Sequence, residues 1–150
     1  MRNALVIADD LSGAAEIAGM GMRYGLAARI VRETPVKFEA GLTVIDTDSR
    51  LLDPAEAAHV MRRFTTDLAG SGFDLIFKKT DSALRGNIRT EIGALLESLG
   101  LRASLLVPQN PSRGRTIRGG TYYIDGIRLD RTDFAHDPDH PARSSKAVEL

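Results

Sequence analysis

Polar side chains able to bind a ligand gather in four short segments of the sequence, each directly after an apolar run. The segments are Asp9–Ala14, Asp46–Arg50, Lys78–Asn87 and Pro108–Gly120. Their carboxylates can accept hydrogen bonds from hydroxyl groups, and their arginines can grip a carboxylate through two parallel hydrogen bonds. These residue types suit a small molecule that carries both hydroxyl groups and an acid.

Particular positions within these segments suit the two ends of such a molecule. Ser12-Gly13 and Gly86-Asn87 lie where helices are expected to start, and free N–H groups and the helix dipole attract a carboxylate or phosphate there. Arg85 is a candidate clamp for the carboxylate. The aspartates that could accept hydrogen bonds from hydroxyl groups are Asp9, Asp10, Asp46 and Asp81.

Several of these residues also have a plain structural interpretation. A pair of aspartates before a helix often serves only as its cap. Successive lysines are often solvated, and strand alternation requires one of Lys78 and Lys79 to point inward without telling which. His59 lies in mid-helix beside apolar neighbours, and His136 and His140 have no partner at ligand spacing. No metal site is therefore expected.

The elements that must position these segments follow from apolar runs, caps and glycines. Strands are expected at residues 4–8, 26–31, 42–45, 73–77 and 103–107, and helices at 12–24, 54–68 and 87–99. Asp53-Pro54 starts the second helix, and Gly70 and Gly72 end it. Alternating strands and helices predict a three-layer α/β fold, with a mostly parallel sheet flanked by helices. The polar segments would then meet at the carboxyl edge of that sheet.

After Pro108 the pattern changes. Pro111, Gly114, Gly119 and Gly120 predict loops, in which Arg113, Arg115 and Arg118 could form a plain surface, and a C-terminal β-hairpin over 122–129 is expected to turn at Asp125-Gly126. From about residue 130 the chain is polar, which indicates a linker or an edge.

Composition narrows the classes of protein. A chain of 150 residues with 43% hydrophobic and 27% charged residues is typical of one globular domain. A net charge of zero argues against a nucleic-acid partner, and no apolar stretch is long enough for a membrane span. The absence of cysteine and of a signal peptide favours a cytoplasmic location.

Taken together and in order, the motifs resemble the N-terminal sugar-binding domain of the four-carbon acid sugar kinase family. The matching stretches are Ala8–Ala14, Asp46–Arg50, Lys78–Asn87, Gly114–Thr116 with Gly119-Gly120, and Asp133–Pro138. The likeness covers nearly the whole chain. One departure is Ser12, where the family commonly has threonine, and the hydroxyl group is kept.

The resemblance implies an ATP- and Mg²⁺-dependent kinase of a four-carbon sugar acid such as threonate, erythronate or an oxo-tetronate. In that family the N-terminal domain holds the acid, and a C-terminal nucleotide-binding domain, expected to be absent from residues 1–150, holds the nucleotide. No G-x-x-x-x-G-K-[ST] phosphate loop occurs in the sequence. We therefore expect no cofactor on this chain and no complete catalysis by it alone, and a homodimer is left open.

The resemblance and the residue chemistry together give one predicted site. The predicted substrate-binding residues are Asp9, Asp10, Ser12, Asp46, Asp48, Arg50, Lys79, Asp81, Ser82, Arg85, Gly86 and Asn87. The attacking hydroxyl needs a positioned proton acceptor, and Asp10 is the candidate catalytic base.

Two alternatives compete with this interpretation. A phosphatase of the haloacid dehalogenase type needs an Asp-x-Asp after an apolar strand, as in Asp46-Thr47-Asp48, but that motif normally ends the first strand of its sheet, and no later acidic pair is found. The other alternative is a non-catalytic module that binds a small acid.

Overall fold

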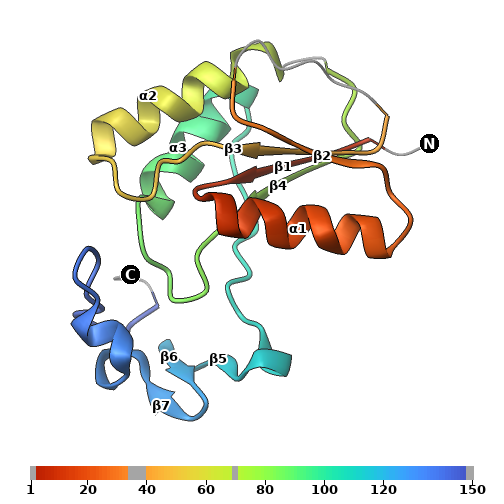
Figure 1. Ribbon diagram of the computed structural model, residues 1–150. Coiled ribbons are helices and arrows are strands. Elements are labelled where there is room, and N and C mark those ends of the chain that lie inside the picture. Colours follow the sequence, from red (N-terminus) through yellow and green to blue (C-terminus); the bar gives the residue numbers. More distant parts are fainter. Residues whose placement is uncertain (1–2, 34–39, 69–70, 148–150) are drawn as a thin grey trace. The chain divides into compact units, whose positions relative to one another are not determined.

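The computed structural model describes residues 3–33, 40–68 and 71–147. The chain folds as two compact units (Figure 1). The first comprises residues up to 80 together with 87–104, and the second comprises 81–86 and the residues from 105 onward.

A parallel four-stranded sheet forms the centre of the first unit. Its strands are β1 (Ala4–Ala8), β2 (Ala28–Val31), β3 (Leu42–Asp46) and β4 (Leu75–Lys79). They lie in the order β2-β3-β1-β4, and every neighbouring pair is parallel. The predicted α/β class is confirmed, and β1 and β3, joined in register with Ala8 opposite Asp46, end at the same edge.

Three helices cover the two faces of this sheet. They are α1 (Leu11–Arg23), α2 (Pro54–Thr65) and α3 (Ile88–Leu99). Figure 1 shows α1 on one face and α2 with α3 on the other. Alternation along β1 explains this, because Val6 packs with Ala14 of α1 whereas Leu5 packs with Met61 and Leu95. The three-layer arrangement is thus set by the period of two in a strand.

The ends of the helices lie close to the predicted signals. Asp10 caps α1 through a 2.8 Å hydrogen bond from Gly13 N, and Asp53 caps α2. A short 3-10 helix, Thr66–Leu68, continues α2. Gly70, predicted to help end it, lies outside the described residues. Over the described ranges, no helix has both the length and the apolar character needed to cross a membrane.

The predicted fifth strand at 103–107 is wrong. Residues 103–107 have no regular structure, and β4 is an edge strand of the sheet as far as the structure describes it. Leu105 is 90% exposed and Val107 66%. An apolar run with high strand propensity forms a strand only when it pairs with a neighbouring strand and buries one face. Within the described part of the chain, residues 103–107 do neither.

The second unit contains a small antiparallel sheet of β5 (Arg115–Arg118), β6 (Thr121–Ile124) and β7 (Ile127–Arg128). The predicted hairpin corresponds to β6 and β7. Its turn residues Asp125 and Gly126 have positive φ, which matches the twist of the strands. The loop predicted before it is wrong over Arg115–Arg118, because a second turn at Gly119-Gly120 folds this segment back as a strand.

The polar tail packs within this unit as far as it is described. It contains two 3-10 helices, Leu129–Arg131 and Asp133–His136. Farther along, Ser145 is buried and its carbonyl accepts a 2.7 Å hydrogen bond from Tyr122 N. The tail thus supplies hydrogen bonds along the hairpin.

Candidate functional site

The loop after β3 folds over the end of β1. Thr47 N donates to the carbonyl of Ala8 at 2.9 Å, and Ser49 N and Arg50 N donate to the carbonyl of Asp9 at 2.9 and 3.2 Å. These backbone contacts bring the first two polar segments of the sequence together. The expected meeting of strand ends is realised here.

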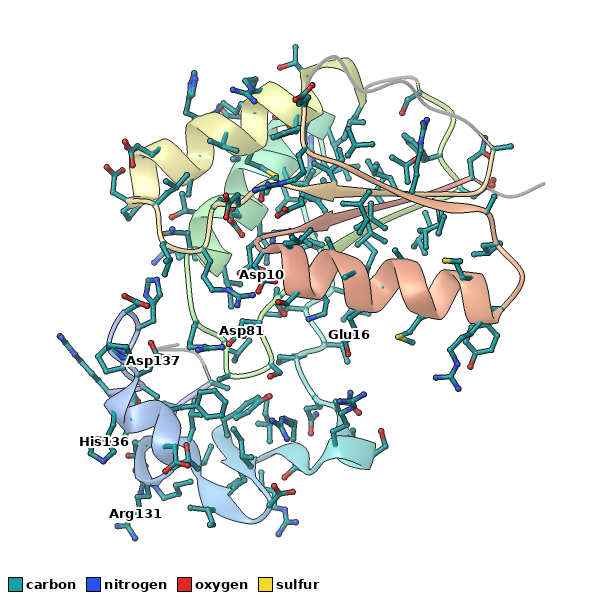
Figure 2. All side chains as sticks on the ribbon, in the orientation of Figure 1. Asp10, Glu16, Asp81, Arg131, His136 and Asp137 are labelled. Carbon is teal, nitrogen blue, oxygen red and sulfur yellow. The ribbon has the colours of Figure 1, made fainter. Side chains whose placement is uncertain are left out.

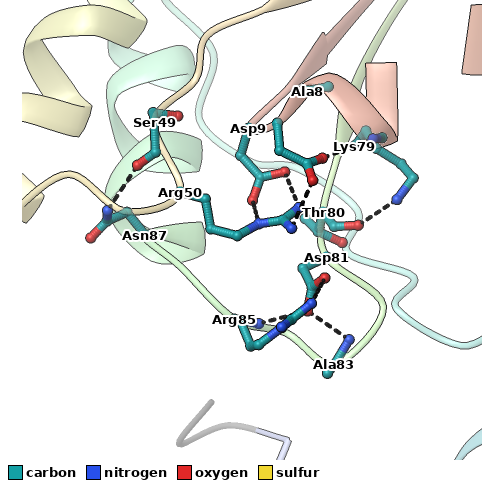
Figure 3. A network of polar contacts seen from close by, with 12 residues as sticks. Ala8, Asp9, Ser49, Arg50, Lys79, Thr80, Asp81, Ala83, Arg85 and Asn87 are labelled. Carbon is teal, nitrogen blue, oxygen red and sulfur yellow. Dashed lines mark hydrogen bonds and ion pairs between the residues drawn. The ribbon is translucent and has the colours of Figure 1, made fainter. Parts of the chain in front are cut away.

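Arg50, Asp9 and Asp10 form a cluster at this edge, which we call the Arg50 cluster. Figure 3 labels Arg50 and Asp9 of this cluster. Arg50 binds Asp9 through two hydrogen bonds, of 2.8 Å from Nε and 3.0 Å from Nη2, and its Nη1 lies 2.9 Å from Asp10 Oδ2. The side chain of Asp9 is 2% exposed and that of Asp10 is 26% exposed. Asp10 is therefore the carboxylate of the cluster that a ligand can reach.

Lys79 lies beside the first turn of α1. Its Nζ donates to the carbonyl of Thr80 at 2.9 Å and lies 3.6 Å from Glu16 Oε2. A Cβ placed on Gly13 would come within 2.8 Å of Asp10 Oδ1 and 3.5 Å of Lys79 Cγ, so the three residues are in close contact. Figure 2 shows Asp10 at the start of α1 and Glu16 farther along it.

We call this edge of the first unit the rim. It consists of the Arg50 cluster, Lys79 and the exposed Ser12 in the first turn of α1. It combines a reachable carboxylate, an ammonium group and the N-terminus of a helix. Such a surface can accept hydrogen bonds from hydroxyl groups and attract an anion.

Asp46 and Asp48 form a second group around Arg32. Arg32 Nε lies 2.8 Å from Asp46 Oδ2, and its Nη2 donates to Asp48 Oδ2 at 2.9 Å. The side chain of Asp46 is fully buried, and burial raises its pKa, while the backbone N–H of Asp48 and the charge of Arg32 act in the opposite direction. A carboxylate buried in this way cannot reach a phosphate ester as a nucleophile, which argues against the phosphatase alternative.

Sequence reasoning missed Arg32, Glu16 and the buried pair of Lys78 with Glu91. Arg32 directly follows the second predicted strand, so a charged side chain at a strand end was the available signal. Glu91 stood at helical spacing from Ile88 and Leu95, so a charge on an apolar face was the available signal. The structure also settles which lysine points inward, because Lys78 pairs with Glu91 and Lys79 approaches Glu16.

Asp81, Ser82, Arg85 and Gly86 belong to the second unit. The carboxylate of Asp81 accepts hydrogen bonds from Ala83 N at 2.9 Å and from Arg85 Nε and Nη2 at 2.8 and 2.9 Å. Arg85 Nη1 donates to Asp137 at 2.7 Å. Hydrogen bonding to Asp81, followed by its charge and by Asp137, raises the pKa of Arg85. Arg85 is therefore already engaged by two carboxylates.

Ser82 and Asn87 likewise have structural contacts. The carbonyl of Ser82 accepts a 2.7 Å hydrogen bond from the Tyr122 hydroxyl within the second unit. The side chain of Asn87, in the first unit, donates to the carbonyls of Ser49 and Leu52 at 3.3 and 2.8 Å and makes no cap for α3. The predicted site residues thus belong to two different units, and the meeting of Asp10, Asp46 and Arg85 in one pocket stays a prediction.

A family model described as "Sugar-binding N-terminal domain" matches residues 4–150. The chain belongs to this family. The resemblance inferred from the motifs is thereby confirmed.

Relatives of this sugar-binding domain are kinases of four-carbon acids. D-erythronate kinase of Heliobacterium modesticaldum is 33% identical over 156 residues, covering 100% of this chain and 36% of the kinase. D-threonate kinase of Bordetella bronchiseptica is 33% identical over 153 residues, covering 97% of this chain and 38% of the kinase. The chain thus spans little more than a third of these relatives.

A solved structure from Bordetella bronchiseptica has the same fold as this sugar-binding domain. It is described as a domain of unknown function with bound citrate, forming a domain-swapped dimer. The TM-score is 0.84 at 30% identity, over 99% of this chain and 39% of the other. The likeness extends across both units.

Proposed function

We propose that this chain is the sugar-acid-binding domain of a kinase that phosphorylates a four-carbon sugar acid, and that the acid binds at the rim. In this proposal the polar tail from about residue 130 is part of the sugar-acid-binding domain. The observation that carries it is the Arg50 cluster at the start of α1, with Lys79 beside it. The named relatives support the substrate class, and the citrate of the Bordetella structure, itself a hydroxy acid, supports the chemistry.

The residues of the rim contact different groups of the ligand, according to their charge. Lys79 and the first turn of α1, with Ser12, attract the carboxylate of the ligand. Asp10 accepts a hydrogen bond from a hydroxyl group of the ligand. Its Oδ1 accepts from Gly13 N and its Oδ2 lies beside Arg50, and a carboxylate oxygen can accept a further hydrogen bond. In this proposal the same carboxylate takes the proton of the attacking hydroxyl.

The remaining predicted site residues support the ligand less directly. Asp46 and Asp48 hold the loop after β3 through Arg32, and Asn87 holds it through Ser49. A ligand carboxylate at Arg85 would have to compete with Asp81 and Asp137. We therefore propose that Asp81, Ser82, Arg85 and Gly86 shape the second unit rather than form the main acid clamp.

The proposal places the nucleotide and its metal ion outside this chain. Among the described residues, no three His, Cys, Asp or Glu side chains are grouped so that they could hold a metal ion. The sequence also lacks a phosphate-binding loop. Because the chain spans little more than a third of the kinases that it resembles, we propose that another part of the protein, outside residues 1–150, binds ATP with Mg²⁺. We also propose a cytoplasmic location for this chain. A homodimer is proposed too, because the Bordetella structure is described as a domain-swapped dimer.

Calorimetric titration of D-threonate and D-erythronate into the chain tests this function, with Asp10→Asn as the variant. Asparagine still caps a helix but removes the charge, so we expect the Kd to rise by about tenfold or more. Asp53→Asn is the matched control, because Asp53 also caps a helix but, among the described residues, makes no hydrogen bond or ion pair with the Arg50 cluster or Lys79, and it should leave the Kd unchanged. Failure of the wild-type chain to bind either acid, or equal affinity in Asp10→Asn, would contradict the proposal.

A further inference from the structure

A buried ion pair joins β4 to α3 in the first unit. Lys78 Nζ lies 2.9 Å from Glu91 Oε2, and the two side chains are 7% and 1% exposed. Burying two charges is costly, and apolar side chains of similar volume often stabilise a core as well or better. Both side chains are too buried to meet a ligand directly. The pair therefore calls for a role beyond the stability of the core.

The other oxygen of Glu91 contacts the loop after β3. The hydroxyl of Ser49 donates a hydrogen bond to Glu91 Oε1. Ser49 Oγ also lies 2.8 Å from Thr47 Oγ1, and the Thr47 hydroxyl lies 2.8 Å from the carbonyl of Ala8, to which it donates. Both hydroxyl groups are buried. Because each hydroxyl donates only once, the Ser49–Thr47 contact is a close approach of two buried oxygens, and Glu91 holds this loop through Ser49.

The backbone of the same loop continues the connection to the rim. Ser49 N and Arg50 N both donate to the carbonyl of Asp9, at 2.9 and 3.2 Å. Arg50 follows Ser49 directly and holds the carboxylates of the Arg50 cluster. A shift of Ser49 would therefore move the backbone of Arg50 and, with it, the carboxylate of Asp10.

We propose that Glu91 is a positioning residue for acid binding. It holds Ser49 with one oxygen and Lys78 with the other, and so fixes the loop that presents Arg50. This inference rests on the proposed function, in which Asp10 of the Arg50 cluster contacts the sugar acid. Glu91 acts through Ser49 and Arg50 and does not touch the ligand.

Two variants and a matched control test this role by calorimetric titration of D-threonate into the chain. Glu91→Gln removes the charge at nearly constant shape, and Ser49→Ala removes the hydroxyl that Glu91 holds. We expect each to raise the Kd by about tenfold, as for other supporting groups behind a site. Glu97→Gln, on the exposed part of the same helix where Glu97 pairs with Arg62, should leave it unchanged.

The double variant Ser49→Ala with Glu91→Gln separates positioning from general weakening. If both residues act through one contact, the Kd of the double variant should be no higher than the higher of the two single-variant Kd values. A Kd that rises in the double variant by the product of the two single increases would overturn the proposed connection.

Hydrogen exchange of the amides of Ser49 and Arg50, followed by NMR without ligand, tests the positioning separately from the function. We expect these amides to exchange faster in Glu91→Gln and Ser49→Ala than in the wild-type and Glu97→Gln chains. If the wild-type chain binds no acid, the proposed function fails, and the exchange rates still decide whether Glu91 orders the loop. Folded variants with wild-type exchange rates would overturn the inference, and Ser49→Ala decides it if Glu91→Gln fails to fold.

Discussion

At the scale of single residues, the structure shows how each charge of the polar segments is paired. Arg85 and Arg50 looked alike in the sequence, as arginines within polar segments after strands. Arg85 is bound by Asp81 and Asp137, whereas Arg50 holds one buried aspartate and one that solvent reaches. The proposed site at Asp10 follows from this difference, because Arg85 is held by two carboxylates whereas Asp10 pairs with one arginine and lies beside Lys79 and the first turn of α1.

The titration of Asp46 tests the electrostatics of the group around Arg32. Burial raises the pKa of Asp46 above its ordinary value of 3.8, and the charge of Arg32 opposes that rise. We expect Arg32→Gln to raise the pKa of Asp46 further, as measured by carbon NMR titration of its carboxyl group. Arg62→Gln, at an exposed ion pair with Glu97, should leave this titration as it is.

The raised pKa also has a consequence for stability. The folded state keeps the Asp46 proton to a higher pH than the unfolded state does, so its contribution to the free energy of unfolding is fully present below pH 3.8. That contribution is lost as the pH rises through the folded pKa. A measured pKa of Asp46 at or below 3.8 in the wild-type chain would contradict this account.

At the scale of elements, the first turn of α1 has little room for change. A Cβ on Gly13 would lie 2.8 Å from Asp10 Oδ1, the oxygen that caps the helix, whereas a Cβ on Gly19 of the same helix would meet nothing within 4 Å. The two glycines of one helix therefore differ in what a methyl group would disturb.

We expect Gly13→Ala to displace the carboxylate of Asp10 and to raise the Kd for D-threonate by about tenfold. Gly19→Ala should keep the affinity and stabilise the chain by about 0.5–1 kcal/mol, since alanine favours a helix over glycine. Calorimetric titration and urea unfolding of both variants provide the measurement. Unchanged affinity in Gly13→Ala would show that the close contact at the rim does not matter for binding.

At the scale of the whole molecule, the apolar run from Leu105 to Val107 is the exposed stretch that follows the first unit in the chain. Large exposed apolar side chains in sequence contribute little to the stability of a fold and favour self-association. This run is also where the sequence predicted a buried strand, so its energetics test that correction.

Leu105→Ala should change the free energy of unfolding by less than about 0.5 kcal/mol. The same substitution at Leu5, which is fully buried in β1, should cost about 2–5 kcal/mol. Urea unfolding monitored by circular dichroism compares the two variants. A cost above about 2 kcal/mol at Leu105 would mean that the run is buried as a strand after all.

The fold could be predicted wherever the signal was local. The apolar run at Ala4–Ala8, the cap at Asp53-Pro54 and the turn at Asp125-Gly126 each depend on a few neighbours in the sequence, and each was found at or near its predicted place. Strand β5 was missed because its partner is needed to make it a strand. The strand predicted at 103–107 was wrong for the same reason, because this run has no partner strand among the described residues.

The sequence by itself determined the α/β class, the motifs and the family, because these depend on periodicity and on residue order. Only the tertiary structure decided the pairing of charges: Arg50 with Asp9 and Asp10, Arg32 with Asp46, and Lys78 with Glu91. The physical reason is that an ion pair needs two side chains within a few ångströms. For elements far apart in the chain, strand order and register set that distance. The spacing of residues along the sequence does not encode strand order or register.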